Sequence, residues 1–119
     1  MSDHRVVDDI TTLQADVLKA LAHPRRLQIM LRLDEGPCEV GALAVKLGLS
    51  QPNLSQHLAV LRATGLVDAV RDGREVRYQL ADPEVITACT IMRGVLERRI
   101  TRLATLSSPS AEATLLARP

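Results

Sequence analysis

The chain has 119 residues, of which 46% are hydrophobic and 1% aromatic, and its formal net charge at pH 7 is +1. This length fits one domain with an aliphatic core. Because a core of that size contributes little stability, we expect a partner subunit. The near-neutral charge argues against a general basic coat for nucleic acid but allows a local basic patch. No apolar run is long enough to span a membrane and the N-terminus is unlike a signal peptide, so we expect a cytoplasmic protein.

Two helices are predicted in the first third of the chain. Apolar residues recur every three or four positions over residues 5–22, on one helix face made of Val6, Ile10, Leu13, Val17 and Leu21. Pro24 disfavours helical geometry before it and suits the first turn of a second helix over residues 24–33. The inward-facing residues of this helix are expected to be Leu27, Met30 and Leu31. Arg25 and Arg26 fit either a DNA phosphate contact or a solvated turn.

A short strand and a third helix follow. Residues 38–40 predict a strand that joins a later hairpin as its third member. A helix over residues 40–47 is expected to bury Leu43, Ala44 and Leu47 and to end at Gly48. Because another helix begins directly afterwards, the two form a helix, a short glycine-containing turn and a helix, which is the arrangement of a DNA-binding motif.

The fourth predicted helix begins at Ser50, which can cap its free N–H groups, and Pro52 suits its first turn. Its apolar face consists of Leu54, Leu58 and Leu61, at positions i, i+4 and i+7. Its polar side carries amides and hydroxyls in place of Lys and Glu: Gln51, Asn53, Ser55 and Gln56. Such groups can pair with the edges of bases. Gly65 is expected to end the helix in the left-handed conformation, with Leu66 making the apolar contact that often follows.

A β-hairpin is predicted next. Apolar and polar residues alternate over residues 76–80, as in a half-buried strand, and the Asp72-Gly73 pair ahead of them indicates a tight turn flanked by Arg71 and Arg74. The order of elements predicts a mainly α fold with a small β-hairpin wing, the winged helix-turn-helix. In that fold the polar helix enters the major groove and the wing reaches the flanking backbone. The alternative is a protein-interaction module with the same fold and no DNA binding.

Asp82 and Pro83 predict the start of a last helix that extends to about residue 106. Its apolar stripe consists of Val85, Cys89, Met92, Leu96, Ile100 and Leu103. Because this stripe is too long for one small domain to cover, we expect it to form a dimer interface with the first helix and a second subunit. Its arginines are expected to face solvent, with contact to DNA or an acidic ligand as the alternative: Arg93, Arg98, Arg99 and Arg102. We therefore expect one domain over residues 1–106 and a disordered tail over residues 107–119.

The segment from about residue 18 to residue 80 resembles the ArsR/SmtB family of bacterial winged-helix repressors. The resemblance rests on ALAHPRRLQIMLRL, on the DGR of the hairpin turn, and on Ser50, Ser55, His57, Leu58 and Leu61 in that order. It implies a homodimer built from the first and last helices, which binds a dyad-symmetric DNA operator and leaves it when an inducer binds. It also implies that the base-reading residues are Gln51, Asn53, Ser55 and Gln56 and that the wing contact is Arg74. No catalytic arrangement of residues stands out, so we do not expect an enzyme.

The sensor chemistry of that family is where this sequence departs from the pattern. Its metal sensors carry a Cys-x-Cys pair at the third helix or Asp and His ligands along the last helix, because the ion needs three or four converging ligands. Here Cys38 stands alone, the last helix lacks histidine, and His4, His23 and His57 have no ligand spacing, so we expect no metal cofactor. A thiol switch built from Cys38 and Cys89 stays an alternative, provided that their Cα atoms lie within about 7 Å. The alternative role for Cys89 is that of a small buried hydrophobic side chain. The sequence does not identify the inducer.

Overall fold

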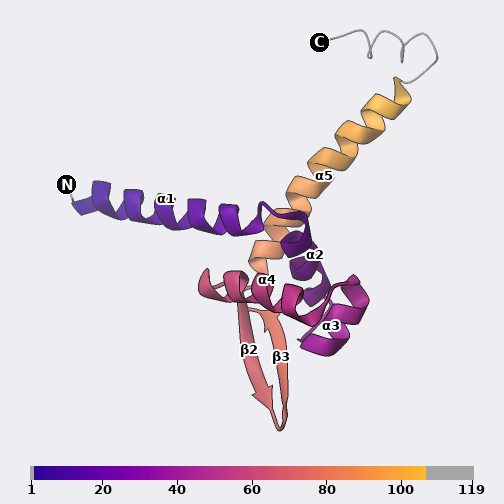
Figure 1. Ribbon diagram of the computed structural model, residues 1–119. Helices are drawn as coiled ribbons and strands as arrows, with labels where there is room; N and C mark the ends of the chain where they lie inside the picture. The colour runs from indigo at the N-terminus through magenta and orange to yellow at the C-terminus, as the bar shows by residue number, and fades with distance from the viewer. Residues whose placement is uncertain (1, 107–119) are drawn as a thin grey trace. The chain divides into compact units, whose positions relative to one another are not determined.

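The computed structural model describes residues 2–106, with side chains from residue 9 onward. Its elements are α1 (Ser2–Leu21), α2 (Pro24–Leu33), β1 (Cys38–Glu39), α3 (Val40–Leu47), α4 (Gln51–Ala63), β2 (Val67–Asp72), β3 (Glu75–Leu80) and α5 (Glu84–Thr105) (Figure 1). The predicted fold class and element order are confirmed. The expected disordered tail, residues 107–119, lies outside the described residues.

The chain divides into two compact units, residues 1–86 and residues 87–119. The first unit holds α1 to β3 and the first residues of α5, and the described part of the second unit is the remainder of α5. Within the described residues no helix combines the length and the apolar character needed to cross a bilayer.

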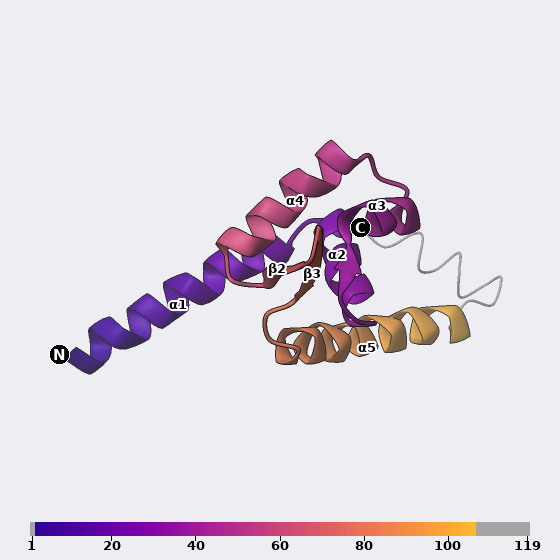
Figure 2. The same ribbon diagram turned by 90° about the horizontal axis from the view of Figure 1, so that it is seen from below.

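The core of the first unit lies where α2, α3 and α4 meet one another and the sheet (Figure 2). Its most deeply buried side chains are Ile29, Met30, Leu43, Leu54, Leu58, Leu61 and Val67. The predicted apolar face of α4 is therefore confirmed, and α3 buries Leu43 and Ala44 as expected, with Leu47 half-buried. Because the leucines of α4 all point inward, its polar residues are left on the outside.

Helix α2 differs from the prediction in which residues it buries. Ile29, Met30 and Leu33 are buried, whereas Leu27 is 36% exposed and Leu31 is half-buried. The neighbours of α2 explain this shift, because α3, α4 and β3 all pack against the helix and cover the side that carries Ile29. Spacing within ten residues correctly predicted the helix and the burial of Met30, but it missed the burial of Ile29 and Leu33.

Capping interactions fix the turn between α3 and α4. The Glu39 carboxylate accepts hydrogen bonds from the first free N–H groups of α3 at 2.9 and 3.2 Å, and Gly48 ends that helix with φ of 65°. Ser50 Oγ then accepts from the Asn53 N–H at 3.3 Å, as predicted. Gly65, with φ of 75°, follows the end of α4, also as predicted. Each of these helix ends thus has its free backbone groups capped by residues next to it in the sequence.

The sheet has the order β1-β3-β2 with antiparallel pairing throughout, so the expected third strand is confirmed. Strands β2 and β3 form a hairpin that projects beyond α4 (Figure 1). Asp72 is the last residue of β2 and pairs with Glu75, which leaves Gly73 and Arg74 as the two turn residues. The tight turn is therefore confirmed, but its centre lies one residue further along than the Asp72-Gly73 pair. Gly73, with φ of 63°, supplies the positive φ that such turns need at their first central position.

The terminal helices leave much of their apolar surface uncovered in the single chain. In α1, Ile10 and Leu13 are 58% and 64% exposed, and burial begins only at Ala20 and Leu21. Val6, the first residue of the predicted stripe, has no described side chain. Four residues of the predicted stripe on α5 are 43–66% exposed: Met92, Leu96, Ile100 and Leu103. These stripes are of the kind that a subunit interface covers.

Candidate nucleic-acid interface

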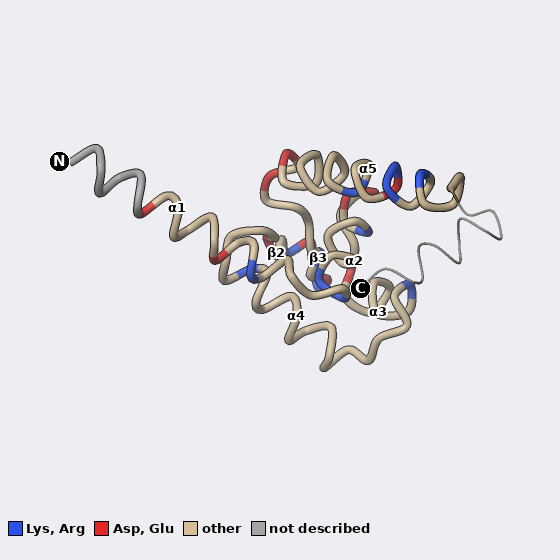
Figure 3. Tube along the Cα trace, turned by 90° about the horizontal axis from the view of Figure 1, so that it is seen from above, with Lys and Arg blue, Asp and Glu red and all other residues tan. Residues whose placement is uncertain are grey.

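The exposed surface of α4 consists almost wholly of uncharged polar and small side chains. Successive helix residues are about 100° apart, so Gln56 lies nearly opposite the buried leucines, with Asn53 on one flank and Ser55 on the other. All three side chains are exposed, as predicted. Figure 3 shows no cluster of charged residues on α4, whose only charged residue is Arg62. Over Asn53, Ser55 and Gln56 this helix therefore presents uncharged hydrogen-bonding groups, as a surface that discriminates between base edges needs.

Gln51, the fourth predicted base reader, is exposed but lies close to α3. A Cβ atom at Gly41 would stand 3.4 Å from Gln51 Nε2, so the amide rests over the first turn of α3. The Gln51 side chain, on α4, therefore lies beside the start of α3. Its amide lies at one end of the surface formed by Asn53, Ser55 and Gln56.

The two faces of the β2–β3 hairpin carry different charge patterns. The register places Arg71 opposite Val76 and Ala69 opposite Tyr78, so these residues share one face of the hairpin. Val67 continues that face and is buried, so it is the side toward the core and α4. The only ionisable groups on it are Arg71 and Tyr78.

The opposite face of the hairpin carries both signs of charge. Asp72, Glu75 and Arg77 lie there, and the Arg77 guanidinium is 3.6 Å from the Glu75 carboxylate and 4.0 Å from that of Asp72. By contrast, Arg71 and the turn residue Arg74 form no ion pair with any described residue, and both are exposed. The predicted wing contact, Arg74, therefore stands at the tip with its charge available to a phosphate.

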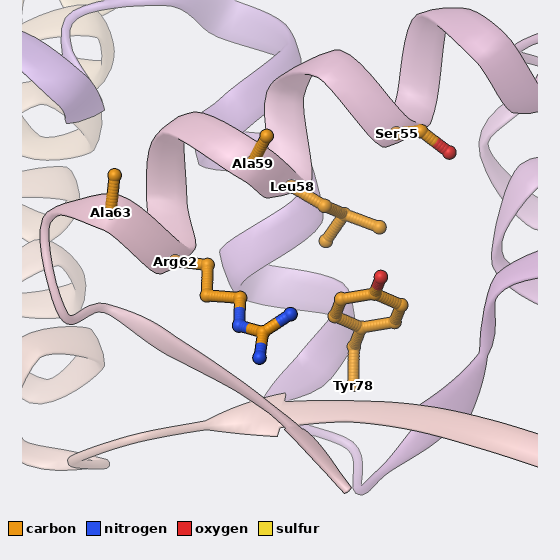
Figure 4. Close-up of a pocket in the computed structure, with 6 residues that line it drawn as sticks. All are labelled: Ser55, Leu58, Ala59, Arg62, Ala63 and Tyr78. Carbon is orange, nitrogen blue, oxygen red and sulfur yellow. The ribbon is translucent and has the colours of Figure 1, made fainter. Parts of the chain in front are cut away.

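A pocket of about 470 Å³ separates α4 from β3. It is lined by Ser55, Leu58, Ala59, Arg62, Ala63 and Tyr78. Figure 4 shows the Arg62 guanidinium and the Tyr78 ring entering this space from the helix and from the strand, with the Tyr78 hydroxyl directed toward α4. Among the predicted site residues, only Ser55 lines this pocket.

The other flank of α4 contacts the start of α2 through two histidines. The rings of His23 and His57 have centroids 4.6 Å apart and planes tilted by 57°. His23 Nδ1 also accepts the Arg25 N–H at 3.2 Å, which caps α2. Burial lowers the pKa of His57, and the positive charges of His23, Arg26 and Arg25 lower it further. This agrees with a structural role for His57, which joins α4 to the start of α2.

The two arginines in the first turn of α2 are engaged within the first unit. Arg26 is half-buried, and its guanidinium donates to the Ala20 carbonyl at 3.1 Å, which ties α2 to the last turn of α1. Arg25 is exposed and donates to the Gln28 side chain at 3.2 Å. The solvated turn therefore describes Arg25, and the bond from Arg26 matches neither of the two predicted roles.

Both cysteines are free thiols, and the structure places them in different units. Cys38 is buried in β1, with its sulfur 4.0 Å from Lys46 Nζ, and Cys89 is half-buried in α5. The thiol switch built from Cys38 and Cys89 stays a prediction. Among the described residues no group of three or more His, Cys, Asp or Glu side chains has the arrangement of a metal site.

Sequence reasoning missed two polar residues of the pocket, Arg62 and Tyr78. A signal was present for each of them. Arg62 follows Ser55 by seven residues and so lies on the same side of α4, and Tyr78 occupies an inward position of the predicted strand. To predict that these two side chains meet, one must know which strand lies beside α4. The helix and strand patterns do not contain that information.

Residues 23–69 match the family described as "Bacterial regulatory protein, arsR family". The HTH-type transcriptional regulator CmtR of Mycobacterium tuberculosis is 49% identical over 70 residues, which are 59% of this chain and 59% of CmtR. The chain thus spans less than two-thirds of the length of that relative. The HTH-type transcriptional regulator Rv0081 of M. tuberculosis is 42% identical over 87 residues, which cover 72% of this chain and 76% of Rv0081.

Solved structures agree with the sequence comparison. The crystal structure of Rv0081 superimposes with a TM-score of 0.71 at 39% identity, over 78% of this chain and 94% of that chain. The solution structure of Mb0332 from Mycobacterium bovis, a homodimeric winged helix-turn-helix DNA-binding domain, gives a TM-score of 0.76 at 31% identity, over 86% of this chain and 93% of that chain. The chain therefore belongs to the ArsR family of bacterial regulatory proteins.

Proposed function

We propose that the protein is a homodimeric transcriptional regulator, acting as a repressor, that binds a dyad-symmetric DNA operator and has no enzymatic activity. Asn53, Ser55 and Gln56 read base edges, with Gln51 at the end of the same surface, and Arg74 contacts the backbone. The observation that carries the proposal is the composition of α4, which buries every leucine and exposes amides and hydroxyls beside a wing with unpaired arginines. Such a protein acts in the cytoplasm, where bacterial DNA lies.

The homodimer is supported by the exposed apolar stripes of α1 and α5 and by the dimer of the related Mb0332 domain. Two copies of α4 related by a two-fold axis fit successive turns of the major groove when they lie about 34 Å apart. A dimer on an operator also occludes other proteins from that stretch of DNA, which is the simplest physical route to repression. An inducer that stabilises another arrangement of the subunits releases the operator.

Selection from a randomised pool of DNA duplexes tests this function without knowledge of the natural operator. We expect enriched sequences with dyad symmetry and half-sites separated by about one helical turn. Enrichment of asymmetric sites contradicts the dimeric arrangement, and absence of any enrichment favours the alternative, a protein-interaction module that has this fold without sequence-specific DNA binding.

A thiol switch built from Cys38 and Cys89 is the second candidate for regulation. It is favoured by the free state of both thiols, of which Cys38 has its sulfur 4.0 Å from Lys46 Nζ. Mass spectrometry of both thiols after peroxide or persulfide treatment, with DNA release followed in parallel, tests it. Release that persists in a double Cys→Ser variant excludes the switch.

A further inference from the structure

The pocket between α4 and β3 contains a cation that no carboxylate balances. Arg62 is exposed, and it forms no ion pair or side-chain hydrogen bond with the described residues. Two other arginines on α2 and β3 differ, since Arg32 pairs with Glu35 at 2.9 Å and Arg77 pairs with Glu75 at 3.6 Å. An unpaired guanidinium beside a concave surface is a binding feature for an anion.

The hydrogen-bonding groups of the pocket suit an anion with several acceptor oxygens. Arg62 offers a planar fork of N–H donors from α4, and the Tyr78 hydroxyl is directed toward that helix from β3 (Figure 4). Ser55, two turns before Arg62, also lines the pocket, with its hydroxyl directed away from these two groups. No carboxylate lines the pocket. The apolar remainder, Leu58, Ala59 and Ala63, leaves space without offering acceptors that compete for the guanidinium.

The surroundings of the pocket indicate which anion this is. Ser55 is shared with the base-reading surface of α4, so an occupant of the pocket lies next to any DNA bound there. On the wing, Arg71 continues the face of Tyr78 toward the tip, where Arg74 stands. The free cations therefore follow one another from α4 to the end of the wing, while the carboxylates of Asp72 and Glu75 lie on the other face.

We propose that a phosphate of the DNA backbone occupies this pocket, bound by the Arg62 guanidinium and the Tyr78 hydroxyl, with Arg71 extending the same contact along the wing. This inference rests on the proposed DNA-binding function and adds residues to it. The contact positions the recognition helix and does not read sequence, because phosphates are common to every base pair. The hairpin thereby binds DNA with its face toward α4 as well as with its tip.

Fluorescence anisotropy with a labelled duplex of arbitrary sequence, measured over a series of NaCl concentrations, tests this inference. Arg62→Gln should weaken binding about tenfold per pocket, because it removes a charged hydrogen-bond donor. It should also flatten the slope of log affinity against log salt by about 0.9 for each pocket, because one fewer counterion is released. Tyr78→Phe should weaken binding about threefold and leave the slope unchanged, because the hydroxyl is neutral.

Arg77→Gln is the matched control, since it removes the same charge from the wing at a residue paired with Asp72 and Glu75. We expect wild-type affinity and slope for it. If Arg62→Gln behaves like Arg77→Gln, the pocket does not bind the backbone and the inference is wrong. The thermal unfolding midpoint of each variant should match that of the wild type, because both arginines are exposed.

The failure of this inference is distinguishable from the failure of the proposed function. If the wild-type protein binds no duplex at any salt concentration, DNA binding itself is refuted. If the wild type binds and Gln56→Ala loses preference for a selected operator, while Arg62→Gln has no effect, only the phosphate site is refuted. A loss of affinity in Arg62→Gln on arbitrary DNA, with the sequence preference retained, supports the phosphate site.

Discussion

Helices α4 and α5 both carry long apolar stripes, but only α4 has its stripe covered within the chain. The three leucines of α4 are at most 1% exposed, whereas the stripe residues of α5 from Met92 to Leu103 are 43–66% exposed. Helix α4 is therefore held in place by its own chain and can offer its polar side for recognition. Helix α5 instead offers an apolar surface, which calls for a second protein surface to cover it.

The largest effect is expected where the stripe is already covered. Leu54→Ala should lower the free energy of unfolding by about 2–5 kcal/mol, because Leu54 is fully buried and its truncation leaves a cavity. Val60→Ala on the same helix is the control, since Val60 is 38% exposed and should cost under about 1 kcal/mol. Urea titration followed by circular dichroism gives both values. Equal losses in the two variants contradict the assigned inner face of α4.

The uncovered stripe is tested by placing a charge on it. Ile100→Glu should weaken self-association by about 2–4 kcal/mol, because each subunit must bury an unpaired carboxylate. Thr101→Glu adds the same charge off the stripe and should leave association unchanged. Sedimentation equilibrium measures both. A dimer that tolerates Ile100→Glu but not Thr101→Glu places the interface on another side of α5.

The contrast between these helices also shows what sequence can predict. The spacing of Leu54, Leu58 and Leu61 predicted a buried face, and the structure confirms it, because three adjacent elements cover that face within one chain. The same kind of spacing in α5 predicted an apolar stripe, but it does not say what covers the stripe. In α2, Ile29 was missed because the packing direction of a two-to-three-turn helix is set by its neighbours.

The wing contact is expected to have a smaller effect than either stripe. Arg74→Ala should weaken binding of any duplex by about 1 kcal/mol and flatten the salt dependence by about 0.9 per subunit, because one phosphate contact is lost. The affinity for a selected operator and for arbitrary DNA should fall by the same factor. An unaltered salt slope removes the tip of the wing from the interface.

The smallest effect concerns the contact between α4 and α2. The pKa of His57 is lowered in the folded state, by burial first and by the charges of His23, Arg26 and Arg25 next. The unfolded chain therefore binds more protons than the folded chain as the pH falls through the usual histidine range, and stability should decrease as the solution is acidified from about pH 7 to about pH 5. His57→Gln should show a shallower decrease in its unfolding midpoint over that interval. An identical decrease in both proteins shows that His57 does not contribute.

The candidate site was predictable to different degrees along the chain. Exposure of Asn53, Ser55 and Gln56 followed from the helix period, and the hairpin turn followed from the glycine beside Asp72. The ring contact of His23 with His57 was not predictable, since the two residues lie on different helices. Pairing across elements depends on tertiary packing, which a local pattern does not specify.

The central claim is that the exposed polar side of α4 reads DNA while its leucines hold the fold. Affinity of Gln56→Ala and Ser55→Ala for a selected operator, measured together with their unfolding midpoints, tests it most directly. We expect each variant to lose about 1–3 kcal/mol of operator binding and to unfold at the wild-type temperature, because both side chains are exposed. Unchanged operator affinity in both variants would contradict the account.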